Sequence, residues 1–223
     1  MKLLALDTAT EACSAALYRD GSVSEIYEVI GRGHADRLLP MVDELLTEAG
    51  LAVGALDAIA FGCGPGGFTG LRIAAGVAQG LAAGLDKPVV PVSDLAALAA
   101  AGARQRGTDR VLACLDARMG QVYWAAFDCS GERPIAVTEE RLADPTDVVL
   151  PAGEPWFAAG HGFSAYPEMT ERLRGRLAGV APELLPRAAD VARIAALEFA
   201  AGPGLDAARA LPVYLRNEVV HRR

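Results

Sequence analysis

The sequence has few of the residues that build local metal sites or disulfide frameworks. Of its 223 residues, four are cysteines and three are histidines. No two cysteines form a C-x-x-C motif, and no two histidines lie three or four positions apart. A metal site made by local spacing is therefore excluded, and free buried thiols in a reducing cytoplasm are expected.

Long apolar runs and clusters of basic residues are also missing. No apolar run reaches the roughly 20 residues that a membrane-spanning helix needs, and the N-terminal MKLLALDTATEA lacks the apolar core of a signal peptide. We therefore expect a cytoplasmic protein without a membrane segment. A net charge of −7 argues against direct nucleic-acid binding, because phosphate neutralisation needs clustered Lys and Arg. The basic tail residues Arg216, Arg222 and Arg223 are interpreted as solvated.

Hydrophobic periodicity predicts an α/β fold with a mixed five-stranded sheet in the first half. Apolar runs predict strands and 3.6-residue periods predict helices; the expected strands are 3–9, 12–21, 22–30, 56–62 and 87–93, and the expected helices are 34–50, 71–85 and 94–105. Thr69 and Ser93 are candidate N-caps, and Gly50 is expected to end the first helix.

The second half begins by repeating the first. LACLDARMGQVYWAAFDCSG at 112–131 resembles LLALDTATEACSAALYRDG at 3–21, with Asp116 and Asp7 each ending the first strand. This similarity predicts duplicated half-domains at 1–106 and 107–223; the alternative is that any two β-hairpins look alike. The remaining segments predict strands at 133–142 and 156–162, helices at 169–177 and 188–202, and a short last segment at 211–219.

The stretch GCGPGGFTGLR, residues 62–72, contains five glycines and precedes a helix. A Walker A loop is excluded because Phe68-Thr69 stand where Lys-Ser/Thr is required. Dinucleotide binding is disfavoured because the first strand turns back into a hairpin and not into a βαβ unit. Two uses remain: close backbone packing, and exposure of helix N-terminal N–H groups to an anion. Arg72 then either meets a carboxylate or phosphate, or is simply solvated.

Gly76, Gly80 and Gly84 follow at four-residue spacing inside the predicted helix. Each glycine costs a helix about 1 kcal/mol relative to alanine. A glycine stripe permits very close approach of a second element, which is either the chain's own sheet or a helix of another subunit.

Four segments together carry a family resemblance: DTATEACSAAL, GCGPGGFTGLRIAAGVAQGL, LDARMGQVY and PVYLRNEV. They resemble the TsaB (YeaZ) family, bacterial accessory proteins in the synthesis of threonylcarbamoyladenosine in tRNA. The resemblance implies the actin-like, sugar kinase and Hsp70 superfamily, built from two ribonuclease H-like subdomains. It also implies that Asp7 and Asp116 hold positions that face nucleotide phosphates in active relatives.

The same resemblance implies a non-catalytic scaffold or activator that pairs with the paralogue TsaD, and with TsaE, in threonylcarbamoylation. The modified base is the adenosine 3′ of the anticodon in tRNAs that read codons beginning with A, and tRNA is contacted only through the complex. Alone, the chain is expected to form a homodimer through the same surface. TsaD carries His-x-x-x-His, whereas here His34 is followed by Leu38. No catalytic or metal site is therefore expected, and a peptidase is disfavoured because H-E-x-x-H and G-x-S-x-G are missing.

The resemblance assigns two sets of candidate residues. The partner-binding set is His34, Leu38, Met41, Leu45, Phe68, Arg72, Ala75, Gly76 and Gly80. The nucleotide-facing or anion-facing set is Asp7, Gly66, Gly67, Thr69, Asp116 and Arg118. No cofactor of its own is expected; ATP or ADP at a shared interface stays open, and the alternative function is a weak ATPase.

Overall fold

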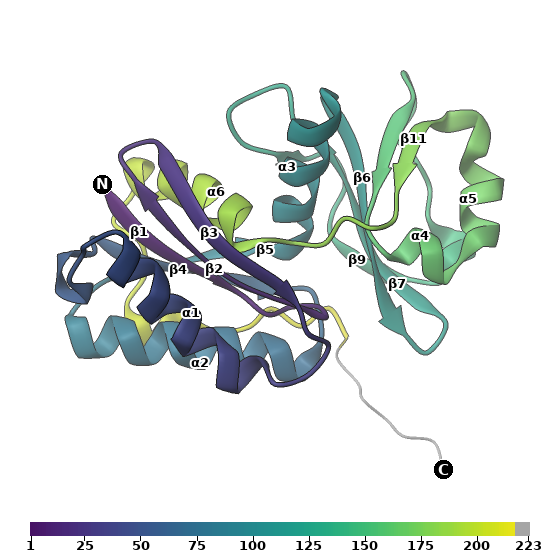
Figure 1. Ribbon diagram of the computed structural model, residues 1–223. Helices are drawn as coiled ribbons and strands as arrows, with labels where there is room; N and C mark the ends of the chain where they lie inside the picture. The colour runs from purple at the N-terminus through teal and green to yellow at the C-terminus, as the bar shows by residue number, and fades with distance from the viewer. Residues whose placement is uncertain (217–223) are drawn as a thin grey trace, which may run out of the picture.

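The computed structural model describes residues 1–216, which form two mixed sheets joined by helices (Figure 1). The predicted α/β class is confirmed. Arg222, Arg223 and the end of the segment expected at 211–219 lie outside the described residues.

The first sheet has the strand order β3-β2-β1-β4-β5. Its strands are β1 (Lys2–Asp7), β2 (Ala12–Arg19), β3 (Ser22–Val29), β4 (Ala58–Gly64) and β5 (Val89–Ser93). The pairs β1–β2 and β2–β3 are antiparallel, and β1–β4 and β4–β5 are parallel. The mixed five-stranded sheet is thus as predicted, with a tight turn at Asp20-Gly21, where both residues have positive φ.

Helices bury both faces of this sheet. The helices are α1 (His34–Glu48), α2 (Phe68–Leu85), α3 (Asp94–Arg106) and α6 (Ala188–Ala201). Because side chains alternate along β1, Leu4 and Leu6 pack against α1 and α2, whereas Leu3 and Ala5 face α6. Helix α3 lies between the two sheets and packs on both (Figure 1).

The two predicted N-caps have different outcomes. Ser93 caps α3, because its Oγ accepts a hydrogen bond of 3.1 Å from the Ala96 N–H. Thr69 does not cap α2, which starts one residue earlier, at Phe68, with Gly67 as its N-cap. The Gly67 N–H donates to the Ala9 carbonyl, and the Gly67 carbonyl accepts from Leu71 N–H, so helical bonding begins before Thr69.

The second sheet has the order β11-β10-β6-β7-β8, with β9 also paired to β7. Its strands are β6 (Arg110–Arg118), β7 (Gln121–Asp128), β8 (Ile135–Ala136), β9 (Arg141–Ala143), β10 (Trp156–Ala159) and β11 (Leu177–Ala181). In the first sheet, β4 lies parallel to the first strand of the β1–β2 hairpin. In the second sheet, β10 lies in the same way beside the β6–β7 hairpin. The similarity of the two sequence segments therefore corresponds to a repeated arrangement of strands. The strand expected at 133–142 is instead the two short strands β8 and β9, and β11 was not predicted.

Short helices complete the chain. They are α4 (Gly162–Ala165), α5 (Pro167–Leu173) and the 3-10 turns η1 (Val53–Ala55), η2 (Pro145–Asp147), η3 (Arg174–Arg176) and η4 (Ala207–Arg209). The helix expected at 169–177 is therefore shorter, because its last residues enter η3 and β11.

The C-terminal part of the chain returns to the first sheet. The expected division at residues 106 and 107 falls between the two sheets, but α6 packs on the first one. Leu205 then exchanges two backbone hydrogen bonds of 2.8 Å with Val89, and Val213 N–H donates to the Cys63 carbonyl at 2.7 Å. Residues that follow the second sheet thus complete the core of the first.

Candidate functional site

Helix α2 presents a stripe of small residues away from the sheet. Its buried residues are Leu71, Ala74, Ala75, Ala78 and Ala82. Phe68, Arg72, Gly76 and Gly80 lie at four-residue intervals on the exposed side. A Cβ added at Gly76, Gly80 or Gly84 would meet no atom of the described residues within 4 Å. The stripe therefore does not pack on the chain's own sheet.

The glycines of the preceding loop behave in the opposite way. A Cβ at Gly66 would lie 2.6 Å from the Ala9 carbonyl oxygen, and one at Gly70 would overlap the Thr8 carbonyl oxygen. Thr8 Oγ1 also donates a hydrogen bond of 2.7 Å to the Gly70 carbonyl. These glycines let the loop and the first turn of α2 press against the turn that follows β1.

A cleft of about 1020 Å³ opens at this junction. Its walls come from the turn after β1, the start of α1, residues 65–73, the end of β6, His161 and residues 213–216. Five expected anion-facing residues line it: Gly66, Gly67, Thr69, Asp116 and Arg118.

Asp7, the sixth expected residue, does not line the cleft. Its side chain is completely buried, and its Oδ1 accepts a hydrogen bond of 2.9 Å from the Ala9 N–H. The assignment of Asp7 to the cleft is therefore wrong, because the turn after β1 covers its carboxylate.

Asp116 lines the cleft but is engaged by its own chain. Its Oδ1 accepts hydrogen bonds from Tyr166 Oη at 3.1 Å and from the Arg118 N–H at 2.8 Å. Its Oδ2 pairs with the Arg118 guanidinium at 2.9 Å. The guanidinium itself is 81% exposed, so Arg118 is the cationic group of this pair that remains open to solvent.

His161 connects the two halves beside Asp116. Its Nδ1 accepts a hydrogen bond of 3.1 Å from the Asp116 N–H, and its Nε2 lies 3.5 Å from Glu11 Oε2. Burial lowers the pKa of His161, although Glu11 and Asp116 oppose that shift. The neutral ring therefore carries its proton on Nε2 and points it at Glu11.

Among the described residues, Arg72 meets aromatic rings and no carboxylate. Its guanidinium carbon lies 3.7 Å from the centre of the Phe68 ring, and its Nε donates a hydrogen bond of 2.9 Å to Tyr214 Oη. The rings of Phe68 and Tyr214 are 5.5 Å apart. This exposed cluster holds the C-terminal segment against the start of α2. Neither Tyr214 nor His161 was predicted, because each reaches its partners across a long sequence separation.

Part of the expected partner-binding set is core. Leu38, Met41, Leu45 and Ala75 are buried against β1 and β2, and His34, the first residue of α1, is 9% exposed. As surface contacts the assignments of Leu38, Met41, Leu45 and Ala75 are wrong, because these side chains pack in the core under the first sheet. His34 lines the cleft. Among the expected residues of this set, Phe68, Arg72, Gly76 and Gly80 are exposed.

Replacing Leu38 with alanine is therefore expected to lower the free energy of unfolding by about 2–5 kcal/mol, because it opens a cavity in the core. Denaturant unfolding measures the loss. Leu39→Ala is the matched control, since Leu39 is 49% exposed and its truncation should change stability by about 0.5 kcal/mol or less. Equal losses in the two variants would contradict this placement of the core.

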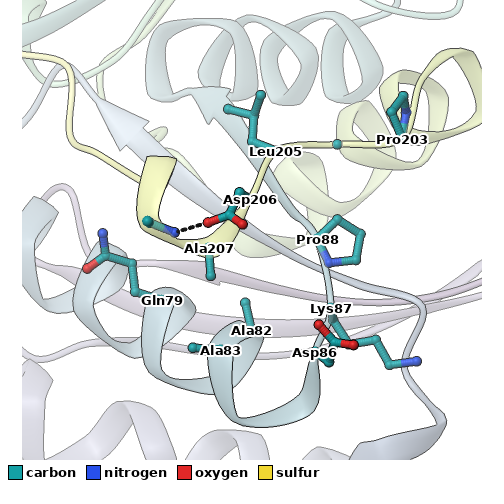
Figure 2. Close-up of a pocket in the computed structure, with 12 residues that line it drawn as sticks. Gln79, Ala82, Ala83, Asp86, Lys87, Pro88, Pro203, Leu205, Asp206 and Ala207 are labelled. Carbon is teal, nitrogen blue, oxygen red and sulfur yellow. Dashed lines mark hydrogen bonds between the residues drawn. The ribbon is translucent and has the colours of Figure 1, made fainter.

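A second hollow of about 690 Å³ lies at the other end of α2 (Figure 2). Gln79, Ala82 and Ala83 of α2 face residues 203–208, where Asp206 accepts a hydrogen bond of 2.8 Å from the Ala208 N–H. The α2 residues that line this hollow are not the glycines of the exposed stripe.

The described residues contain no group of three or more His, Cys, Asp or Glu side chains placed to hold a metal ion. Burial raises the pKa of every cysteine thiol, that of Cys13 to about 11. These thiols stay protonated at neutral pH, which makes them poor nucleophiles. Of the described helices, α2 alone is long and apolar enough to cross a membrane, a weak signal that core helices also give.

Comparisons with known proteins agree with this architecture. The family model described as TsaD, tRNA N6-adenosine threonylcarbamoyltransferase, matches residues 26–192. The solved structure of YeaZ from Pseudomonas aeruginosa is similar, with a TM-score of 0.91 and 49% identity, covering 96% of this chain and 99% of that one.

Relatives that match over their full length identify the family more closely than the family model does. The tRNA threonylcarbamoyladenosine biosynthesis protein TsaB of Escherichia coli is 42% identical over 100% of this chain and 98% of its own length. The protein of the same name from Haemophilus influenzae is 38% identical over 100% of this chain and 97% of its own. The chain belongs to the TsaB family, within the wider family that the TsaD model describes.

Proposed function

We propose that this chain is a non-catalytic subunit that pairs with a TsaD-family protein for threonylcarbamoylation of tRNA in the cytoplasm. The expected base is the adenosine 3′ of the anticodon in tRNAs that read codons beginning with A. The names of its full-length relatives and the match to the TsaD family model support this reaction.

The exposed stripe of α2 is the observation that carries the proposal. Gly76, Gly80 and Gly84 each cost the helix about 1 kcal/mol relative to alanine, yet no described side chain fills the space beside them. Since the isolated chain gains no packing from these glycines, a second backbone laid close against α2 explains them. Phe68, 51% exposed at the start of the stripe, supplies an apolar anchor for the same contact.

The same surface supports self-association when the chain is alone. A second copy can place its own glycine stripe against the first, because a two-fold contact repeats one patch on both subunits. Pairing with TsaD and self-pairing then exclude each other, and TsaE joins the heterodimer. In this arrangement tRNA reaches the chain only through the complex.

A second candidate is a weak site for ATP or ADP in the cleft. The N-terminus of α2 opens there, with Gly66, Gly67 and Thr69 beside the exposed guanidinium of Arg118. Against an ATPase, Asp7 is buried and Asp116 is occupied by Tyr166 and Arg118. Calorimetry with Mg-ATP tests this candidate: no heat at millimolar nucleotide, with or without the partner, would remove it.

Reconstitution tests the main proposal. Purified TsaD, TsaE, threonylcarbamoyl-adenylate and tRNA are combined with and without this chain, and modified nucleosides are measured by mass spectrometry. Modification is expected only in the complete mixture, and the chain alone should give none. Robust modification without the chain would overturn the proposal, as would modification by the chain alone.

A further inference from the structure

Two buried aspartates meet below the glycine loop. Asp7 ends β1 and Asp94 begins α3, and neither side chain is exposed to solvent. Both approach Gly62: a Cβ there would overlap Asp94 Oδ1 and lie 2.9 Å from Asp7 Oδ2. Gly62, the first glycine of the stretch at 62–72, is thus explained by the space that two carboxyl groups need.

One oxygen of each carboxyl group is tied to the backbone. Asp7 Oδ1 accepts from the Ala9 N–H at 2.9 Å, and Asp94 Oδ2 accepts from the Gly64 N–H at 2.5 Å. The other two oxygens, Asp7 Oδ2 and Asp94 Oδ1, find no donor among the described residues. They can satisfy each other only if one of them carries a proton.

No salt bridge within the described residues includes either aspartate. Two ionised carboxylates at this depth would repel each other without a compensating cation, which is very costly in a medium of low dielectric constant. A single proton converts that repulsion into a strong O–H···O⁻ hydrogen bond.

We infer that Asp7 and Asp94 share one proton, and that this pair fixes the Gly62–Gly64 backbone beneath the start of α2. Through these contacts the pair acts as a structural clamp between β1, β4 and α3. Its partner, Asp94, lies far away in the sequence, and no local sequence motif signals the pairing.

The surroundings place the proton on Asp94. Burial raises the pKa of Asp94, and the charge of Asp7 raises it further. Burial also raises the pKa of Asp7, but the hydrogen bond from Asp94 opposes that shift. Other titratable groups that interact electrostatically with the pair come from β2, β3, β4, α1 and the segment before β9: Cys13, Glu25, Tyr27, Cys63, His34 and Glu140. Of these, Glu25 and Glu140 favour retention of the proton, whereas His34 favours ionised Asp7.

The shared proton makes folding depend on pH. The folded chain keeps a proton that the unfolded chain releases above the ordinary aspartate pKa of 3.8. Its stabilising effect is complete below that value and is lost as pH rises towards the raised pKa of Asp94. Over this window the proton makes the unfolding equilibrium constant grow about tenfold per pH unit.

Asp94→Asn removes the shared proton but can keep the hydrogen bonds to Asp7 and to the Gly64 N–H. Its amide N–H₂ can donate to Asp7 Oδ2, and its amide oxygen can accept from the Gly64 N–H. Denaturant unfolding at increasing pH, starting from the ordinary aspartate pKa of 3.8, is expected to show wild type losing stability relative to D94N by about tenfold in equilibrium constant per pH unit until the raised pKa of Asp94 is reached. Asp43→Asn, on the exposed side of α1, is the matched control and should run parallel to wild type.

Infrared spectroscopy in D₂O provides a second readout. Wild type and D43N should show the carbonyl band of a buried protonated carboxyl group at pH values above the ordinary aspartate pKa of 3.8, and the difference spectrum of D94N should lack it. If D94N fails to fold, Asp7→Asn offers the donor from the other side and should remove the same band. The inference would be overturned if the free energies of unfolding of wild type and D94N depended on pH in the same way and D94N lost no carbonyl band. So would stabilisation of wild type, but not D94N, by Mg²⁺ or Ca²⁺, because the pair would then hold a cation.

Discussion

Replacing Gly80 with leucine is expected to weaken pairing with TsaD by about tenfold or more, without destabilising the isolated chain. A Cβ at this position meets no described atom within 4 Å, so the chain itself accommodates the side chain. Leucine also favours the helix by up to about 1 kcal/mol relative to glycine. A partner backbone laid against the stripe would be pushed away, and a loss of 1.4 kcal/mol already means a tenfold change in affinity.

Isothermal calorimetry with the partner and thermal unfolding of the chain alone separate the two effects. Ala200→Leu is the matched control, because it adds the same side chain to the exposed end of α6. It should leave both affinity and stability unchanged. If Gly80→Leu lowered stability and affinity together, or lowered neither, the stripe would not be a pairing surface.

Replacing Gly70 with alanine is expected to do the reverse, destabilising the chain by about 3 kcal/mol, at the upper end of the usual cost of overpacking. The added methyl group would overlap the Thr8 carbonyl oxygen, which is backbone and cannot rotate away. The first turn of α2 would have to move off the turn after β1 and lose the hydrogen bond from Thr8 Oγ1.

Chemical denaturation measures that loss, with Gly76→Ala in the same helix as the control. Gly76 is open on its outer side, so alanine there should raise the free energy of unfolding by about 1 kcal/mol. The smallest side chain at Gly70 should therefore harm the fold more than leucine at Gly80. Equal stability of the two alanine variants would show that the close contact at Gly70 is unimportant.

Much of the first half could be predicted because its signals are local. The turn at Asp20-Gly21, the cap at Ser93 and the apolar period of α1 each depend on residues within a few positions. The repeated hairpin was also visible, since the same strand–turn–strand pattern recurs around Asp116.

The candidate site was harder to predict because its contacts join distant segments. The period that marks Leu38 and Met41 is the same for a helix face on a core and for one on a partner, and only the fold shows which applies. The location of Asp7 beside Asp94 and the contact of Arg72 with Tyr214 likewise depend on how the elements assemble. Glycine content alone could not separate the tightly packed Gly70 from the open Gly80.

The position of α6 also affects how this protein matures on the ribosome. Leu3 and Ala5 are synthesised before the second sheet, yet their cover, Val191 and Ala195, is synthesised after it. The apolar face of the first sheet that α6 covers therefore stays exposed while the whole second sheet is translated. Such a chain is most prone to aggregation during that interval, and it gains protection only when α6 has been synthesised and packs on the sheet.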